Sequence, residues 1–170
     1  FPIHRPSSMP VNALFSFLIK KRLQQIELFR AHPHEAQLEV FHRLINDAKY
    51  TVWGREHGYA SISTPEQYRE RVPLQDYTGL KPYVDRLRKG EQNLLWPTDI
   101  KWFAKSSGTT NAVSKFIPVS REALEDCHYK GGKDLIALHY AHRPDSKLYQ
   151  GMSMVVGGSS TIEQVRTDAY

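Results

Sequence analysis

The hydrophobic pattern of the sequence changes its period at Trp96-Pro97, and this change limits the chain to a fold that contains both helices and strands. Before this point, apolar residues recur every three or four residues, as in helices. After it come two short runs rich in aromatic and β-branched residues, 100–105 and 115–118, which predict strands on either side of a polar loop. We therefore expect an α/β fold with a helical N-terminus, a few strands and an incomplete sheet.

The N-terminal part of the sequence predicts two amphipathic helices separated by a short break. Residues 11–31 carry apolar residues at helical spacing, opposite a polar side that includes Lys20-Lys21-Arg22. Pro33 interrupts this pattern and suits the first turn of a second helix that extends to Ala48. Because the break is short, we expect the two helices to pack antiparallel. The predicted apolar faces are Phe15, Ile19, Leu23, Ile26 and Phe29, and Leu38, Phe41, Leu44, Ile45 and Ala48.

Three further helices are predicted from capping signals. Residues 64–67 (Thr-Pro-Glu-Gln) form a capping box that opens a helix to about Arg71. Residues 80–89 are predicted to form a second helix, with Gly90 as its C-terminal cap. After the second strand, Ser120 suits the N-cap of a helix over 121–142. The apolar sides of the last two consist of Leu80, Val84 and Leu87, and of Leu124, Cys127, Gly131, Leu135 and Leu138.

The helix predicted over 121–142 contains two adjacent glycines, Gly131 and Gly132. They weaken a helix by ~2 kcal/mol relative to alanines, so we expect a kink or the close approach of another element there. The acidic residues of its first turns, Glu122, Glu125 and Asp126, are expected to be exposed and to interact with the helix dipole. Farther along, residues 148–156 predict one or two strands and 157–160 a turn.

Composition and charge exclude several classes of protein. The 170 residues are 40% hydrophobic and 24% charged, as in globular domains, and the apolar run 13–19 is far shorter than the ~20 residues that span a membrane. No secretory signal is recognisable, and residues 1–8 are expected to be a disordered leader or a cloning remnant. The single cysteine excludes an internal disulfide and favours a cytoplasmic location.

Neither a metal site nor a nucleic-acid-binding module is predicted. The pairs His32/His34 and His139/His142 lack a third ligand at a recognisable spacing. Cys127 neighbours His128, but adjacent helical residues do not face each other, so Cys127 is interpreted as a core residue. The net charge of +5 suits anionic ligands, yet no nucleic-acid-binding motif accompanies the basic runs. A noncatalytic nucleic-acid-binding domain remains an alternative interpretation.

The polar loop between the two predicted strands carries the main functional signal. Lys105-Ser-Ser-Gly-Thr-Thr110 consists mainly of small residues, and Lys115 follows at the start of the second strand. Gly108 permits a positive φ, so backbone amides can converge on an anion while hydroxyl groups add hydrogen bonds. Lys115 could supply a positive charge. The loop matches neither a Walker nor a dinucleotide-binding motif, and an ordinary Ser/Thr-rich hairpin turn fits the same residues equally well.

The residues around this loop resemble a specific family. Trp102–Thr110, followed by Lys115–Ser120, is similar to the first nucleotide-binding motif of the adenylate-forming superfamily, in particular of the acyl acid-amido synthetases of the auxin-responsive Gretchen-Hagen family. Residues 51–58, 71–86 and Gly90-Glu91 resemble the segment that precedes the motif in that family. The resemblance extends from about Met9 to the C-terminus and looks closer to bacterial members than to the plant hormone enzymes.

The resemblance implies an ATP- and Mg²⁺-dependent ligase. Such an enzyme converts a carboxylic acid into an acyl-adenylate, releases pyrophosphate and passes the acyl group to an amino acid. Residues 9–170 would be the N-terminal part of its large adenylating domain, without the remainder of that domain, the small mobile domain and the catalytic residues, so the fragment is expected to be inactive alone. A ligase that uses coenzyme A as acceptor is the alternative, and the acid, the acceptor and the oligomeric state stay open.

The resemblance also implies roles for individual residues. The ATP phosphates would be held by Ser106, Ser107, Gly108, Thr109 and Thr110, assisted by Lys115. Three residues of the following helix, Leu135, Leu138 and Tyr140, would border the acyl pocket, although core packing is the more ordinary role of the leucines. The sequence departs from the family at Asn111–Ser114, where other members commonly carry another glycine.

Overall fold

The computed structural model of the protein describes residues 11–106, 114–146, 152 and 154, with the side chains of 11–18 left aside. These residues divide into two compact units. The first is built from residues 11–36 and 126–146, and the second from 37–106 and 114–125. The expected leader at 1–8 and the turn at 157–160 lie outside the described residues, as do the expected strands at 148–156 except for Met152 and Met154, which are in neither helix nor strand.

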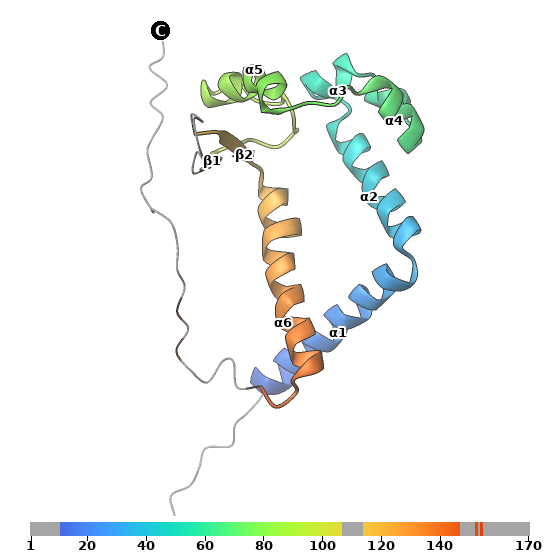
Figure 1. Ribbon diagram of the computed structural model, residues 1–170, viewed down its shortest axis with the longest axis vertical. Coiled ribbons are helices and arrows are strands. Elements are labelled where there is room, and N and C mark those ends of the chain that lie inside the picture. The colour runs from blue at the N-terminus through green and yellow to red at the C-terminus, as the bar shows by residue number, and fades with distance from the viewer. Residues whose placement is uncertain (1–10, 107–113, 147–151, 153, 155–170) are drawn as a thin grey trace, which may run out of the picture. The chain divides into compact units, whose positions relative to one another are not determined.

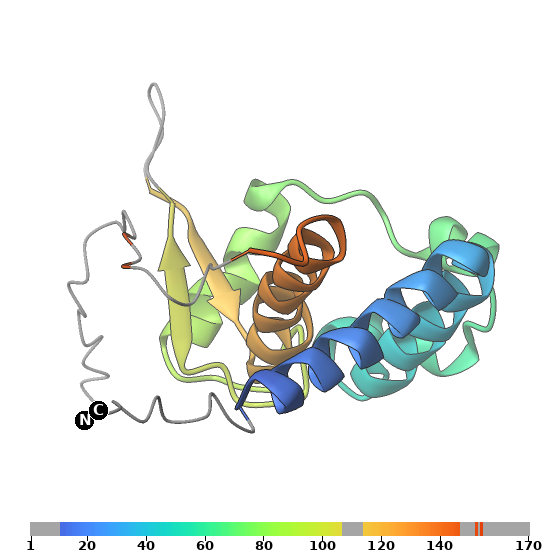
Figure 2. The same ribbon diagram turned by 90° about the horizontal axis from the view of Figure 1, so that it is seen from below.

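The first unit consists of helices α1 (Val11–Ala31) and α6 (Lys130–His142), which pack side by side (Figures 1 and 2). The guanidinium group of Arg22 on α1 binds the carboxylate of Asp134 on α6 through two hydrogen bonds, one of them an Nη2 to Oδ2 contact of 2.8 Å. These residues are 112 positions apart in the sequence. We expected α1 to pack against the next helix in the chain, but in the structure its partner is α6.

The second unit begins within α2 (Pro33–Ala48), whose first four residues are assigned to the first unit. It continues with α3 (Val52–Glu56), the 3₁₀ turn η1 (Tyr59–Ser61) and α4 (Pro65–Arg71). The predicted N-cap of α4 is confirmed, since the hydroxyl of Thr64 accepts a hydrogen bond from the amide of Gln67 at 3.3 Å. The side chain of Gln67 accepts a hydrogen bond from the amide of Ser63 at 2.8 Å, one residue before the amide that a capping box would use. The first core cluster contains Ile45, Ala48, Tyr59 and Ile62, with Phe41, Trp53, Tyr68, Val72 and Trp96 packed around it.

A second core cluster lies under helix α5 (Tyr77–Arg88). Leu87, Leu94 and Ile100 are buried there, in contact with Val52, Tyr83, Leu95 and Phe103. The helix begins three residues earlier than predicted because Asp76 acts as its N-cap and accepts a hydrogen bond from the amide of Gly79 at 2.9 Å. It ends as predicted before Gly90, whose φ of 95° suits glycine.

The two predicted strands are confirmed and form an antiparallel hairpin, β1 (Trp102–Lys105) and β2 (Phe116–Val119). Trp102 pairs with Val119, and Lys105 pairs with Phe116. Helix α5 lies against β2 (Figures 1 and 2). The described residues are thus mostly helical with one two-stranded sheet, as expected of a helical N-terminus with a few strands.

The predicted face of the helix after β2 is wrong. A π-helical segment, η2 (Ala123–Tyr129), precedes α6, so the spacing of the residues before Lys130 does not continue into α6. Within α6, Gly131, Leu135 and Leu138 do share a face, but this face is exposed. Ala137 is buried instead, one turn from Asp134, which binds Arg22 of α1. Cys127 is exposed as well. An added Cβ would meet nothing within 4 Å at Gly131 or Gly132, so no other described element approaches these glycines closely.

Candidate functional site

Ser106 and Lys115 lie where the two strands of the β1–β2 hairpin meet the predicted anion-binding loop, and this pair is called the hairpin base below. The amide of Ser106 donates a hydrogen bond to the carbonyl oxygen of Lys115 at 2.9 Å, and the hydroxyl oxygen of Ser106 accepts one from the amide of Lys115 at 3.1 Å. The Ser106 amide is therefore engaged within the protein, whereas its hydroxyl proton has no acceptor among the described residues. Ser107, Gly108, Thr109 and Thr110 lie outside the described residues.

Three cationic side chains surround the hairpin base. The ammonium group of Lys115 lies 5.4 Å from the centre of the Tyr77 ring. The guanidinium carbon of Arg88 and the ammonium group of Lys105 lie 3.8 Å and 6.0 Å from the centre of the Phe116 ring. Within the described parts of the chain, none of the three forms an ion pair with a carboxylate. Lys115 and Arg88 act on Asp76 and Asp85 only through longer-range charge interactions.

The N-terminal end of α5 supports the start of β2. The hydroxyl of Tyr77 accepts a hydrogen bond from the amide of Phe116 at 3.0 Å, so the helix holds the strand residue that follows Lys115. The hydrogen bond from the Gly79 amide lowers the pKa of Asp76, and the charge of Lys115 adds a smaller effect in the same direction. Asp76 thus stays ionised as the N-cap that fixes the start of this helix.

Glu122 connects the segment after β2 to the loop before β1. Its carboxylate accepts hydrogen bonds from Trp96 Nε1 at 3.1 Å and from Thr98 Oγ1 at 2.8 Å. Sequence reasoning assigned Glu122 to an exposed helix start, but its side chain is half-buried. Partial burial alone would raise the pKa of Glu122, but hydrogen bonds, including those from Thr98 and Trp96, outweigh it and lower the pKa.

We predict that Glu122→Gln lowers the free energy of unfolding by about 1 kcal/mol at pH 7, since a charged hydrogen-bond acceptor becomes neutral. Because the folded-state pKa is lowered, the stabilising effect is present above the ordinary value of 4.5 and is lost as the pH falls through the lowered value. Urea unfolding of both proteins at several pH values measures this difference. A difference that grows as the pH falls below 4.5 would contradict the assignment.

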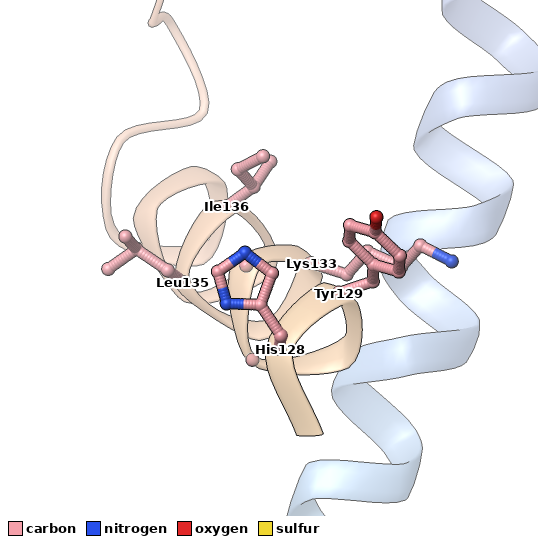
Figure 3. A pocket seen from close by; sticks show the side chains of 7 residues that line it. His128, Tyr129, Lys133, Leu135 and Ile136 are labelled. Atoms are coloured by element: carbon pink, nitrogen blue, oxygen red, sulfur yellow. The ribbon is translucent and has the colours of Figure 1, made fainter. Parts of the chain in front are cut away.

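The three predicted acyl-pocket residues lie on α6, in the other unit. Leu135 helps to line an open concavity of about 630 Å³ around the start of α6, together with His128, Tyr129, Gly131, Gly132, Lys133 and Ile136 (Figure 3). Leu138 is 41% exposed and Tyr140 is half-buried, and neither lines this concavity. The exposure of both leucines rules out core packing among the described residues as their role.

The histidine pairs make local contacts. His139 Nε2 lies 2.8 Å from the hydroxyl of Ser146, and His142 Nδ1 lies 2.9 Å from the carbonyl oxygen of Leu138. Among the residues that the structure describes, no three His, Cys, Asp or Glu side chains converge to hold a metal ion. In the same residues, no helix is both long and apolar enough to span a membrane.

Comparison with known proteins finds plant enzymes that are similar to this chain in sequence. The chain is 25% identical over 122 residues to the jasmonoyl–L-amino acid synthetase GH3.3 of Oryza sativa subsp. japonica, a match that covers 71% of this chain and 25% of the relative. It is 34% identical over 61 residues to the indole-3-acetic acid-amido synthetase GH3.15 of Arabidopsis thaliana, covering 35% and 10% of the two chains.

A solved structure has the same fold. The AtGH3.15 acyl acid amido synthetase in complex with 2,4-DB aligns with a TM-score of 0.65 at 23% sequence identity, covering 84% of this chain and 23% of that chain. The chain thus spans about a quarter or less of the length of these relatives. Residues 22–166, more than half of the chain, match the GH3 family N-terminal domain, and the protein belongs to the GH3 family.

Proposed function

We propose that this chain forms the ATP-phosphate-binding part of an acyl acid amido synthetase. The observation that carries the proposal is the hairpin base, where Ser106 and Lys115 are bonded to each other at the two ends of the Ser-Ser-Gly-Thr-Thr loop. Such a base holds the loop ends together and leaves the Ser106 hydroxyl proton and the Lys115 ammonium group as donors. Donors held in position in this way are the main protein contribution to phosphoryl and adenylyl transfer.

The described residues fit a polyphosphate ligand. Lys105 and Lys115 flank the loop and form no ion pair within the described residues, so an anion need not displace a carboxylate to reach them. In the same residues no carboxylate cluster would hold a metal ion, and we infer that Mg²⁺ enters bound to the ATP phosphates, which is its usual mode in nucleotide sites. ATP, when bound, supplies the adenylyl group that makes a carboxylate reactive.

The proposed overall reaction is the ATP-dependent conjugation of a carboxylic acid with an amino acid. It is supported by membership of the GH3 family and by the names of the relatives, which are synthetases of amino acid conjugates of jasmonate and indole-3-acetate. Leu135, Leu138 and Tyr140 remain our candidates for contact with the acyl group. The exposure of the two leucines supports this role, because an apolar ligand would cover side chains that are otherwise in water.

The proposal predicts that Lys115→Met raises the Kd for MgATP at least tenfold, because one charge-assisted contact with the phosphates is lost. AMP, which lacks the β- and γ-phosphates, should be affected far less. The matched control is Lys130→Met, which removes the same charge from a lysine paired with Asp126 at 2.5 Å. Isothermal titration calorimetry of the 170-residue chain and of both variants measures the Kd for MgATP and for AMP.

Equal weakening by the two substitutions would show that the effect arises from net charge alone. No MgATP binding by the unsubstituted chain would overturn the proposed function.

A further inference from the structure

Besides Lys115, the cation Arg88 has surroundings in which an anionic ligand could bind. Arg88 is the last residue of α5. Its guanidinium carbon lies 3.8 Å from the centre of the Phe116 ring, a close cation–π contact. Its Nε atom is buried and has no hydrogen-bond partner among the described residues. A buried donor without a partner costs roughly 1–3 kcal/mol and is rare in proteins. Because Nε is closed off from solvent, an anion that binds Arg88 would contact the terminal nitrogens of the guanidinium group.

The other charged residues of α5 have partners. Arg86, two residues earlier, binds Glu91 through Nε at 2.8 Å and Nη2 at 2.5 Å. Asp85 accepts a hydrogen bond from Lys81 at 2.5 Å, and the charge of Arg88 contributes only a smaller effect to its lowered pKa. The guanidinium group of Arg88 therefore keeps its hydrogen-bond donors free of carboxylates in the described part of the chain.

Lys105 brings a second cation, which has no ion-pair partner among the described residues, to the same ring. Its ammonium group lies 6.0 Å from the centre of Phe116, so Lys105 Nζ and the Arg88 guanidinium carbon are within about 10 Å of each other. Lys105 and Phe116 are paired across the two strands and thus extend from the same face of the hairpin. A ligand with several negative charges along its length could contact both cations, whereas a single carboxylate is too short.

We propose that Arg88 and Lys105 form a polyphosphate subsite over Phe116. The inference rests on the proposed function and extends it, since it adds two cations to the expected loop and Lys115. The planar guanidinium group suits bidentate hydrogen bonding to phosphate oxygens, and its contact with Phe116 restricts the side chain before the ligand arrives. The ligand is the triphosphate of a nucleotide or the pyrophosphate that adenylation releases.

Arg88→Gln should raise the Kd for inorganic tripolyphosphate about tenfold, because the charge and the paired donors are lost. Arg86→Gln is the matched control, with the same change two residues away on a side chain that already has a carboxylate partner, and it should change the Kd less than about twofold. Arg88→Lys keeps the charge without the planar donors and should fall between the two. Calorimetry at low salt measures the Kd for tripolyphosphate of the 170-residue chain and of the three variants, and thermal unfolding checks that each variant is folded.

The outcomes separate this inference from the proposed function. If Lys115→Met weakens tripolyphosphate binding but Arg88→Gln and Arg88→Lys do not, the subsite is wrong and the proposed function stands. Equal effects of Arg86→Gln and Arg88→Gln also overturn the subsite, since they reflect net charge. If the unsubstituted chain does not bind tripolyphosphate, both proposals fail. Should Arg88→Gln unfold the chain, an Arg88→Lys protein that binds as tightly as the unsubstituted one overturns the role of the planar donors.

Discussion

Replacing Gly54 by alanine is expected to unfold the helical part of the second unit. A Cβ atom at this position would lie 2.1 Å from the carbonyl oxygen of Ala48, far inside van der Waals contact. That oxygen accepts hydrogen bonds from the Thr51 amide at 3.0 Å and the Thr51 hydroxyl at 2.7 Å, so moving it breaks the cap of α3. We expect a loss of more than about 3 kcal/mol, which is a large fraction of the stability of a small domain.

The matched control is Gly131→Ala on α6. An added Cβ meets nothing within 4 Å there, and the backbone is helical, so alanine should stabilise the helix by about 0.5–1 kcal/mol. Urea unfolding followed by circular dichroism measures both substitutions. A Gly54→Ala protein as stable as the unsubstituted one would contradict the close contact between α3 and the end of α2.

Truncating Leu94 to alanine is expected to destabilise the second unit by about 2–5 kcal/mol. The side chain of Leu94 is fully buried, with 0% exposure, between Leu87 and Ile100. Its carbonyl oxygen accepts a hydrogen bond from the Trp53 amide at 3.0 Å, which holds the surrounding backbone in place and limits its collapse into the cavity. For a unit of this size the melting temperature should fall by more than about 8 °C.

Leu74→Ala provides the comparison, because Leu74 is fully exposed and its truncation should change the stability by less than about 0.5 kcal/mol. Thermal unfolding of both proteins checks the expectation. Similar melting temperatures for the two variants would mean that Leu94 is not a core residue.

Local signals in the sequence were sufficient for most helices and for the hairpin. Pro33 and the Thr64 N-cap act within one turn of the chain, so the starts of α2 and α4 were predicted correctly. The strands were predicted because the aromatic and β-branched runs are separated by a loop short enough for antiparallel pairing. The apolar spacing predicts the start of α5 three residues too late, because the helix begins at the N-cap Asp76 and not at its first apolar residue on the buried side.

The candidate site was predicted only in part. The residues flanking the loop, Ser106 and Lys115, are brought together as a hairpin requires. The cation–π contact of Arg88 with Phe116 could not be predicted, because the two residues are far apart in the sequence and Arg88 lies outside the motif that contains Phe116. That no described carboxylate pairs with Arg88 also depends on the positions of all the acidic residues around it.

The sequence by itself determined most of the helices and the two strands, because capping and hydrophobic periodicity act over a few residues. Only the tertiary structure decided which helix packs against α1, since the ion pair between Arg22 and Asp134 joins residues 112 positions apart. It also decided which face of α6 is buried, because α6 packs against α1 through the side that carries Asp134, and the face that carries Leu135 and Leu138 is exposed. Periodicity identifies the faces of a helix but contains no information about a partner that distant.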